Sequence, residues 1–147
     1  FARGAGVGRA AVAEEASRDP GRRRRDVDDH AEAHGAATER ASRLEEYARR
    51  SNAVLQETGP QTVVGTKGSL RTAASRDAAA ERGRAAAAGA PYQGQAGHVP
   101  DTAVTGQPVP PGGYLDMRGN SSSIAGGCIG NCVGQTIVGY TVDGKIP

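Results

Sequence analysis

Large apolar side chains are scarce in this sequence. Its 147 residues include no Trp, one Phe and four Tyr, and Leu, Ile, Val and Phe together number only 21. So low a share is typical of chains that are partly disordered, although a net charge of +2 argues against disorder throughout. The 22 Gly and 8 Pro residues add to the entropy that folding must restrict, so we expect a small core and low stability.

Long apolar runs and cysteines are rare as well. No stretch is long enough to cross a bilayer, and the residues from Phe1 to Gly8 lack the apolar run of a signal peptide. Because the sequence begins with Phe, we expect a fragment or a processed product of a longer chain. Cys128 and Cys132 leave three interpretations open: two small half-buried residues, a redox-sensitive local disulfide, or a metal site that includes His98.

Charged residues are concentrated in the front of the chain. Residues 1–97 hold 16 Lys/Arg and 13 Asp/Glu, whereas residues 98–147 hold two and three. Such a shift is typical of a domain boundary. We predict a disordered or linker segment at 1–35, a helical Ala/Arg-rich region at 36–89 and a C-terminal segment at 90–147 that carries the candidate catalytic residues. The expected fold class is α+β, with N-terminal helices and a small irregular, Gly/Pro-rich C-terminal domain that carries short strands.

Two helices are predicted in the front region. Over residues 37–57 the larger side chains recur at intervals of three and four, which places them on one helix face: Leu44, Tyr47, Ser51, Val54 and Leu55. A second helix is capped by Ser69, runs to Ala88 and ends at Gly89. Its arginines form either a solvated face or a nucleic-acid contact: Arg71, Arg76, Arg82 and Arg84.

Strands and turns are predicted closer to the end of the chain. Residues Gln61–Thr66 favour a short strand, and Thr136–Val142 favour a longer one that ends at the turn Asp143-Gly144. Between Gly89 and the longer strand, repeated prolines break any long helix, so we expect an irregular path with Gly at the bends. Irregular loops on a small frame are where binding and catalytic groups tend to lie.

A histidine and an aspartate three residues apart form the strongest chemical motif. In a tight turn, the imidazole of His98 and the carboxylate of Asp101 can meet, and the carboxylate then fixes the tautomer and raises the basicity of the ring. Such a pair activates water or holds a divalent cation that does so. Spacing of this kind is found more often in structural turns, so the motif alone does not establish a site.

The residues around this motif extend the pattern. His98–Gly106 is followed by the glycine- and proline-rich run Pro110–Gly113 and then by Asn120–Gly127. This arrangement resembles the HxxD-motif nuclease-toxin domain (type 15) of bacterial polymorphic toxins over roughly residues 92–127. It departs from the family in an extra Ser and Ala before the final glycines, and in the run Cys128–Cys132 that follows.

The resemblance implies a metal-assisted DNase that is secreted, acts in the cytoplasm of a target bacterium and is neutralised by a cognate immunity protein. It implies that His98 and Asp101 are the catalytic pair and hold a divalent cation, Mg²⁺ being the expected ion. Asn120, Ser121 and Ser122 match its downstream box. With Arg118 they are predicted to contact the substrate phosphate, helped by the backbone N–H groups of Gly126-Gly127. A secretion system or a larger parent chain is the other expected partner.

Two further functions stay open. The chain is also interpretable as a non-enzymatic C-terminal interaction segment of a larger secreted protein. The third hypothesis is an RNase toxin that uses His98 without a metal. Because the residues around His98 are not basic, DNA contacts would have to come from the Arg-rich helices or from Arg118.

Overall fold

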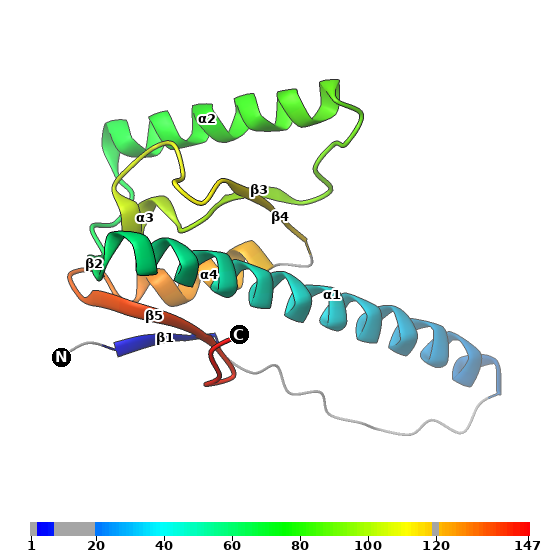
Figure 1. Ribbon diagram of the computed structural model, residues 1–147. Helices are drawn as coiled ribbons and strands as arrows, with labels where there is room; N and C mark the ends of the chain where they lie inside the picture. Colours follow the sequence, from blue (N-terminus) through cyan, green and yellow to red (C-terminus); the bar gives the residue numbers. More distant parts are fainter. Residues whose placement is uncertain (1–2, 8–19, 119–120) are drawn as a thin grey trace.

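A long helix, α1 (Pro20–Thr58), runs through the middle of the computed structural model of this chain (Figure 1). The model describes residues 3–7, 20–118 and 121–147, with side chains from residue 34 onward except those of 122 and 123. On one side of α1 lie α2 (Gly68–Ala87) and a two-stranded sheet; on the other lie α4 (Ser121–Gly130) and a three-stranded sheet. The fold is therefore mixed α+β, as predicted.

Helix α1 begins earlier than its apolar spacing indicates. The sequence pattern predicts a start near residue 37 after an unstructured segment, but residues 20–35 are already helical. The expectation of an unstructured segment at 1–35 is therefore corrected over residues 20–35 and over a short strand at residues 3–7, and residues 1–2 and 8–19 lie outside the described ranges. Four Arg and two Ala, which have high helix propensity, lie within residues 20–35, and Pro is well tolerated in a first helical turn because its missing N–H has no partner to lose.

The three-stranded sheet has β5 (Thr136–Val142) at its centre. β1 (Arg3–Val7) pairs with it in parallel, and β2 (Gln61–Thr62) pairs with it antiparallel. The bounds of β5 and the following turn, where Asp143 and Gly144 both have positive φ, agree with the prediction. The strand predicted over residues 61–66 is shorter than expected.

The second sheet is a pair that leads into the HxxD motif. β3 (Gln95–His98) and β4 (Tyr114–Met117) run antiparallel, and His98 faces Tyr114 in the register. After β3, the short helix α3 (Thr102–Thr105) is capped by Asp101 and ends at Gly106, whose φ is +66°. This pairing places the motif between a strand and a helix start.

Helix α2 ends where the sequence indicates. Gly89, with φ +79°, follows its last turn, and the amide of Ala90 donates to the carbonyl of Ala85. This closing bond is typical of a glycine-terminated helix. At the other end, the cap position is Lys67 rather than Ser69, and its side chain makes no capping hydrogen bond.

Helix α4 was not expected. The composition around Gly126 and Gly127 predicts a polar loop that offers backbone N–H groups to phosphate, but these residues are helical. Their amides belong to the second turn, where they donate within the helix. Ala125 and Ile129, one turn apart, are buried in the core, and this burial stabilises the helix despite its glycines.

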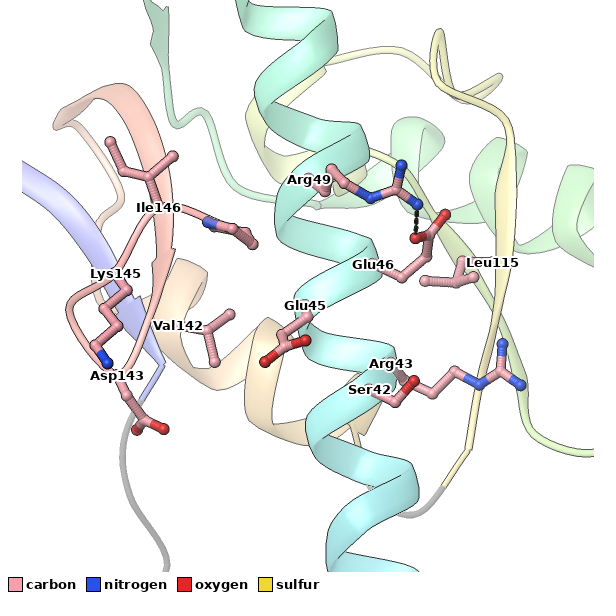
Figure 2. A pocket seen from close by; sticks show the side chains of 11 residues that line it. Ser42, Arg43, Glu45, Glu46, Arg49, Leu115, Val142, Asp143, Lys145 and Ile146 are labelled. Carbon is pink, nitrogen blue, oxygen red and sulfur yellow. Dashed lines mark hydrogen bonds and ion pairs between the residues drawn. The ribbon is translucent and has the colours of Figure 1, made fainter.

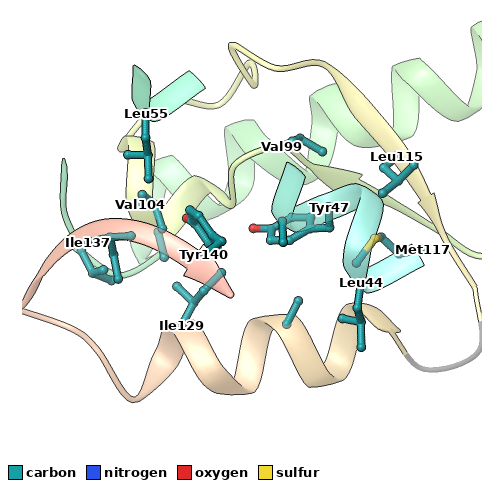
Figure 3. Packing of buried hydrophobic residues seen from close by; sticks show 14 residues of the cluster. Leu44, Tyr47, Leu55, Val99, Val104, Leu115, Met117, Ile129, Ile137 and Tyr140 are labelled. Carbon is teal, nitrogen blue, oxygen red and sulfur yellow. The ribbon is translucent and has the colours of Figure 1, made fainter. Parts of the chain in front are cut away.

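The core is small and draws on α1, α3, α4, β4 and β5 (Figure 3). Tyr47 and Tyr140 meet edge to face at its centre, with ring centroids 5.8 Å apart. All five residues of the predicted α1 face are buried. The cluster consists of Leu44, Tyr47, Ala48, Leu55, Val63, Val99, Ala103, Val104, Leu115, Met117, Ala125, Ile129, Ile137 and Tyr140.

Two smaller expectations concern the cysteines and membranes. Cys128 and Cys132 are free, half-buried thiols at the end of α4, and the Sγ–H of Cys132 donates to the carbonyl oxygen of Cys128.

Over the described ranges, no helix combines the length and the apolar content needed to cross a bilayer.

Candidate functional site

The HxxD motif forms a buried turn between β3 and α3. Val99 and Pro100 at its centre are fully buried, and the peptide bond between them is cis. The amide of Val99 donates to the carbonyl of Gly113 at 3.0 Å, and the amide of Gly112 donates to the carbonyl of Val99 at 2.7 Å. These bonds fix the backbone on both sides of the motif, so that the two polar side chains at its ends have defined positions.

Asp101 faces α1 and β5. Its Oδ1 accepts a hydrogen bond from the amide of Ala103 at 2.8 Å, which caps α3, and its own amide donates to the Tyr47 hydroxyl at 2.9 Å. Burial raises the pKa of both Tyr47 and Tyr140, and the nearby charge of Asp101 raises these pKa values further. The carboxylate therefore lies beside the tyrosine pair of the core.

His98 faces α2 and the loop after α3. Its Nε2 lies 3.0 Å from the carbonyl oxygen of Pro108 and 3.3 Å from the hydroxyl oxygen of Tyr114. The two rings contact each other with centroids 4.8 Å apart. Tyr114 in turn donates its hydroxyl hydrogen to the carboxylate of Asp77 on α2. The imidazole is half-buried and contacts two groups, Pro108 in the loop after α3 and Tyr114 in β4, while Asp77 holds Tyr114 from α2.

The structure thus brings His98 and Asp101 to the two ends of one turn but gives them separate partners. Within the described part of the chain, no hydrogen bond joins their side chains. The expectation that Asp101 fixes the tautomer of His98 is therefore not supported. Pro108 and Tyr114 occupy that position instead, because the chain path turns the imidazole and the carboxylate toward different elements.

The donor groups fit a hydrated hard cation better than an enclosed metal centre. Among the residues that the structure describes, no three His, Cys, Asp or Glu side chains converge as a protein-enclosed site requires. Asp101 keeps one carboxylate oxygen that bonds to no described residue. Mg²⁺ commonly binds through one or two carboxylates and takes its other ligands from water and substrate phosphate. Asp101 is the residue that would hold it.

Arg118 and Ser121 are engaged within the protein. The Nε of Arg118 donates to Asp116 at 2.8 Å, and its guanidinium pairs with Glu39 on α1 at 3.4 Å. The bond to Asp116 raises the pKa of this guanidinium. Ser121 is fully buried, and its hydroxyl donates to the carbonyl of Arg118 at 2.7 Å. This position closes the start of α4 and turns the serine hydroxyl away from solvent, which corrects its predicted phosphate contact.

The rest of the predicted phosphate-binding box is only partly visible. Asn120 lies outside the described residues, and of Ser122 only the helical backbone is described. Their predicted roles stay predictions.

No protein-family model, curated protein or solved structure matches this chain. The resemblance to the HxxD nuclease-toxin domain therefore rests on the motifs quoted above.

Sequence reasoning missed the two residues that lie behind His98. Tyr114 follows the Pro/Gly-rich loop and meets His98 only because β3 and β4 pair in this register. Asp77 lies 37 positions before Tyr114, on a helix whose composition is dominated by Ala and Arg. A tyrosine opposite a histidine would have been a usable signal once the hairpin was predicted, but nothing in the sequence pointed to Asp77.

A surface cavity of about 540 Å³ adjoins this site. Tyr114 lines it, together with Tyr92, Asp116, Arg118 and Glu81. The Tyr92 hydroxyl donates to Glu81 at 2.9 Å, and burial followed by this bond raises its pKa to about 12. An aromatic wall beside the imidazole is the kind of surface on which a nucleobase can stack.

A larger cavity, about 810 Å³, lies elsewhere (Figure 2). It separates α1 from the turn after β5, where Glu45 and Val142 face the same space. Its charged lining is of mixed sign, with Arg43, Arg49 and Lys145 beside Glu45, Glu46 and Asp143. None of the predicted site residues lines it, so we place the candidate site at His98.

Proposed function

We propose that this chain is a nuclease that hydrolyses DNA phosphodiester bonds with His98 as its general base. The observation that carries the proposal is the environment of the imidazole. One ring nitrogen is anchored by Pro108 and Tyr114, and Nδ1 has no hydrogen-bond partner among the described residues. A half-buried imidazole with one nitrogen anchored and the other available is suited to accept a proton from water.

Asp101 has two roles in this proposal. Its Oδ1 holds the start of α3 and so fixes the turn that carries His98. Its second oxygen, which bonds to no described residue, would hold Mg²⁺, and the bound ion would supply charge neutralisation at the phosphate. Because the helix cap needs only an acceptor, whereas a cation needs negative charge, the two roles are separable by substitution.

Substrate binding is assigned to α2 and the adjoining cavity. Arg71, Arg76 and Arg82 are exposed and form no ion pair with any described residue. The two acidic side chains of α2 accept hydrogen bonds from tyrosines: Asp77 from Tyr114, and Glu81 from Tyr92. The solvent-facing charge of this helix is therefore basic and can attract a phosphate backbone, and the same helix contacts the strand that carries His98.

The biological setting follows from the resemblance. A secreted effector of this class enters the cytoplasm of a rival bacterium, and its own producer needs an immunity protein that blocks the site. Both remain part of the proposal.

Plasmid cleavage by the purified protein tests the proposal, with Mg²⁺ and with EDTA. Replacing His98 by Ala is expected to lower the rate about 100-fold or more, because general acid–base groups contribute on that scale. His34→Ala is the matched control, since His34 is exposed on α1 and remote from the motif. A His98→Ala protein that nicks DNA as fast as the parent would exclude the site.

Substitutions at Asp101 separate the cap from the charge. Asp101→Asn keeps an acceptor for the Ala103 amide, so the fold is expected to survive while Mg²⁺-dependent cleavage falls. Full activity in Asp101→Asn would assign Asp101 to structure alone. Cleavage of RNA that persists in EDTA would instead favour the metal-independent RNase hypothesis.

A further inference from the structure

Two residues outside the HxxD motif are connected to the imidazole of His98 by hydrogen-bond contacts. Tyr114 stands opposite His98 across the β3–β4 pair, and Asp77 approaches the same tyrosine from α2. The three side chains form a continuous series in which the Tyr114 hydroxyl contacts both the Asp77 carboxylate and the Nε2 of His98. Such a series constrains where each hydrogen lies.

The position of the imidazole hydrogen follows from the donor inventory. Tyr114 has a single hydroxyl hydrogen, and it donates this hydrogen to Asp77. Toward His98 the tyrosine oxygen can therefore only accept. The carbonyl of Pro108, the other neighbour of Nε2, also only accepts. Nε2 must then carry the hydrogen, and the lone pair of the neutral ring lies on Nδ1.

The tyrosine is suited to this role because it keeps its own hydrogen. Burial raises the pKa of Tyr114 well above its usual value, and the hydrogen bond to Asp77 raises it further. The hydroxyl therefore stays protonated at neutral pH. As long as Asp77 accepts that hydrogen, the oxygen presents only lone pairs to the imidazole.

We infer that Asp77 and Tyr114 are positioning residues that hold His98 in the Nε2–H tautomer, and that Nδ1 is the atom that takes the proton from the attacking water. This inference rests on the proposed nuclease function. In the step it describes, the water oxygen forms a bond to phosphorus and the water proton moves to Nδ1. The bond from phosphorus to one ester oxygen breaks, and the departing oxygen takes a proton from solvent.

A second tyrosine–carboxylate pair on the same helix offers a matched comparison. Tyr92 donates to Glu81 one turn further along α2 but forms no hydrogen bond with the imidazole of His98. Removing either hydroxyl costs the protein the same kind of hydrogen bond. Only the removal of the Tyr114 hydroxyl or of the Asp77 carboxylate is expected to change the tautomer of His98.

Nitrogen NMR of the imidazole tests the tautomer directly. In a ¹⁵N-labelled protein at a pH of about 9, well above the ordinary pKa of histidine, N–H and lone-pair nitrogens differ clearly in chemical shift. The His98 signals are assigned by their loss in His98→Asn. We expect wild-type Nε2 to have the shift of an N–H nitrogen and Nδ1 that of a lone-pair nitrogen. The opposite pattern overturns the inference.

A double-substitution cycle tests whether Asp77 acts through Tyr114. In Asp77→Asn, the new amide can donate to Tyr114, which frees the hydroxyl hydrogen to point at His98 and should populate the Nδ1–H tautomer. In a Tyr114→Phe background the same change should leave the His98 shifts unmoved. An equal change in both backgrounds overturns the inference. Tyr92→Phe and Glu81→Gln are the controls, expected to leave the His98 signals in place.

Cleavage kinetics provide the functional readout. Asp77→Asn is expected to lower kcat about 10- to 100-fold with little change in KM, as when a histidine loses its orienting partner. An unchanged kcat alongside a shifted tautomer would overturn the assignment of Nδ1 as the proton acceptor. The NMR measurements need no substrate, so the two proposals can fail separately. If the wild-type protein shows the expected His98 signals but does not cleave DNA, the proposed nuclease function is wrong and the tautomer assignment remains supported.

Discussion

Burial raises the pKa of all four tyrosines of this chain, and in each case burial is the largest cause. Tyr92 and Tyr114 also donate to carboxylates, which favours the protonated hydroxyl further. Tyr47 and Tyr140 pack together in the core, near the charge of Asp101. At the scale of single residues, the four tyrosine hydroxyls therefore link the stability of the fold to alkaline pH.

The ionisation of these tyrosines gives a testable pH dependence. A folded-state pKa raised above the usual 10.0 stabilises the protein fully below pH 10, and this contribution is lost as the pH rises through the folded value, about 12 for Tyr92. With no Trp in the chain, tyrosinate absorbance reports on these groups alone. We expect little tyrosinate at pH 10 in the native protein and roughly half in urea. Half ionisation of the native protein at pH 10 would contradict this.

At the scale of elements, two glycines in and just after helix α2 differ in the backbone conformation that they adopt. Gly83 lies within the helix, and a Cβ added there would meet no atom within 4 Å. Gly89 follows the helix with φ +79°, a conformation that side chains with a Cβ rarely adopt, although the space around it is equally open. The local backbone, and not packing, decides what each position tolerates.

Alanine at these two positions should therefore shift stability in opposite directions. Gly83→Ala is expected to raise the free energy of unfolding by about 0.5–1 kcal/mol, because glycine weakens a helix interior. Gly89→Ala is expected to lower it by about 1–2 kcal/mol. Urea unfolding followed by circular dichroism measures both changes. Shifts of the same sign would show that α2 does not end as described.

At the scale of the whole molecule, α1 ties the two sheets together through residues on opposite sides of the helix. Arg50 donates to the carbonyl oxygens of Tyr114 at 3.0 Å and Gly112 at 2.5 Å, next to β4. Two positions on, which is about 200° around the helix, Asn52 exchanges two hydrogen bonds with the backbone of Tyr140 in β5. Because the core is so small, we expect these hydrogen bonds to make a large contribution to holding the two sheets against α1.

Removing either contact should loosen one sheet more than the other. Arg50→Ala and Asn52→Ala are each expected to cost about 2–3 kcal/mol, because partly buried backbone groups lose their partners. Amide hydrogen exchange should rise first in β3 and β4 for Arg50→Ala, and in β5 for Asn52→Ala.

The neighbouring Arg49 is the matched control. It is exposed and, among the residues that the structure describes, pairs only with Glu46 one turn away, so Arg49→Ala should change stability by less than about 0.5 kcal/mol. A loss at Arg49 as large as that at Arg50 would mean that charge, and not the link to β4, is responsible.

Local patterns predicted several elements correctly. The buried face of α1 around Leu44 and Tyr47, the end of α2 at Gly89 and the strand Thr136–Val142 with its turn agree with the structure. Helix α4 was missed because the low helix propensity of its glycines is outweighed by the burial of Ile129.

The sequence by itself determined which residues alternate, which recur at helical spacing and where a glycine must end a helix, because these properties depend on neighbours along the chain. Only the tertiary structure decided what His98 contacts. Its spacing from Asp101 suggested one partner, whereas the pairing of β3 with β4 and the packing of α2 supplied Tyr114 and Asp77. Hydrogen bonds are short and directional, so their partners follow from the path of the whole chain.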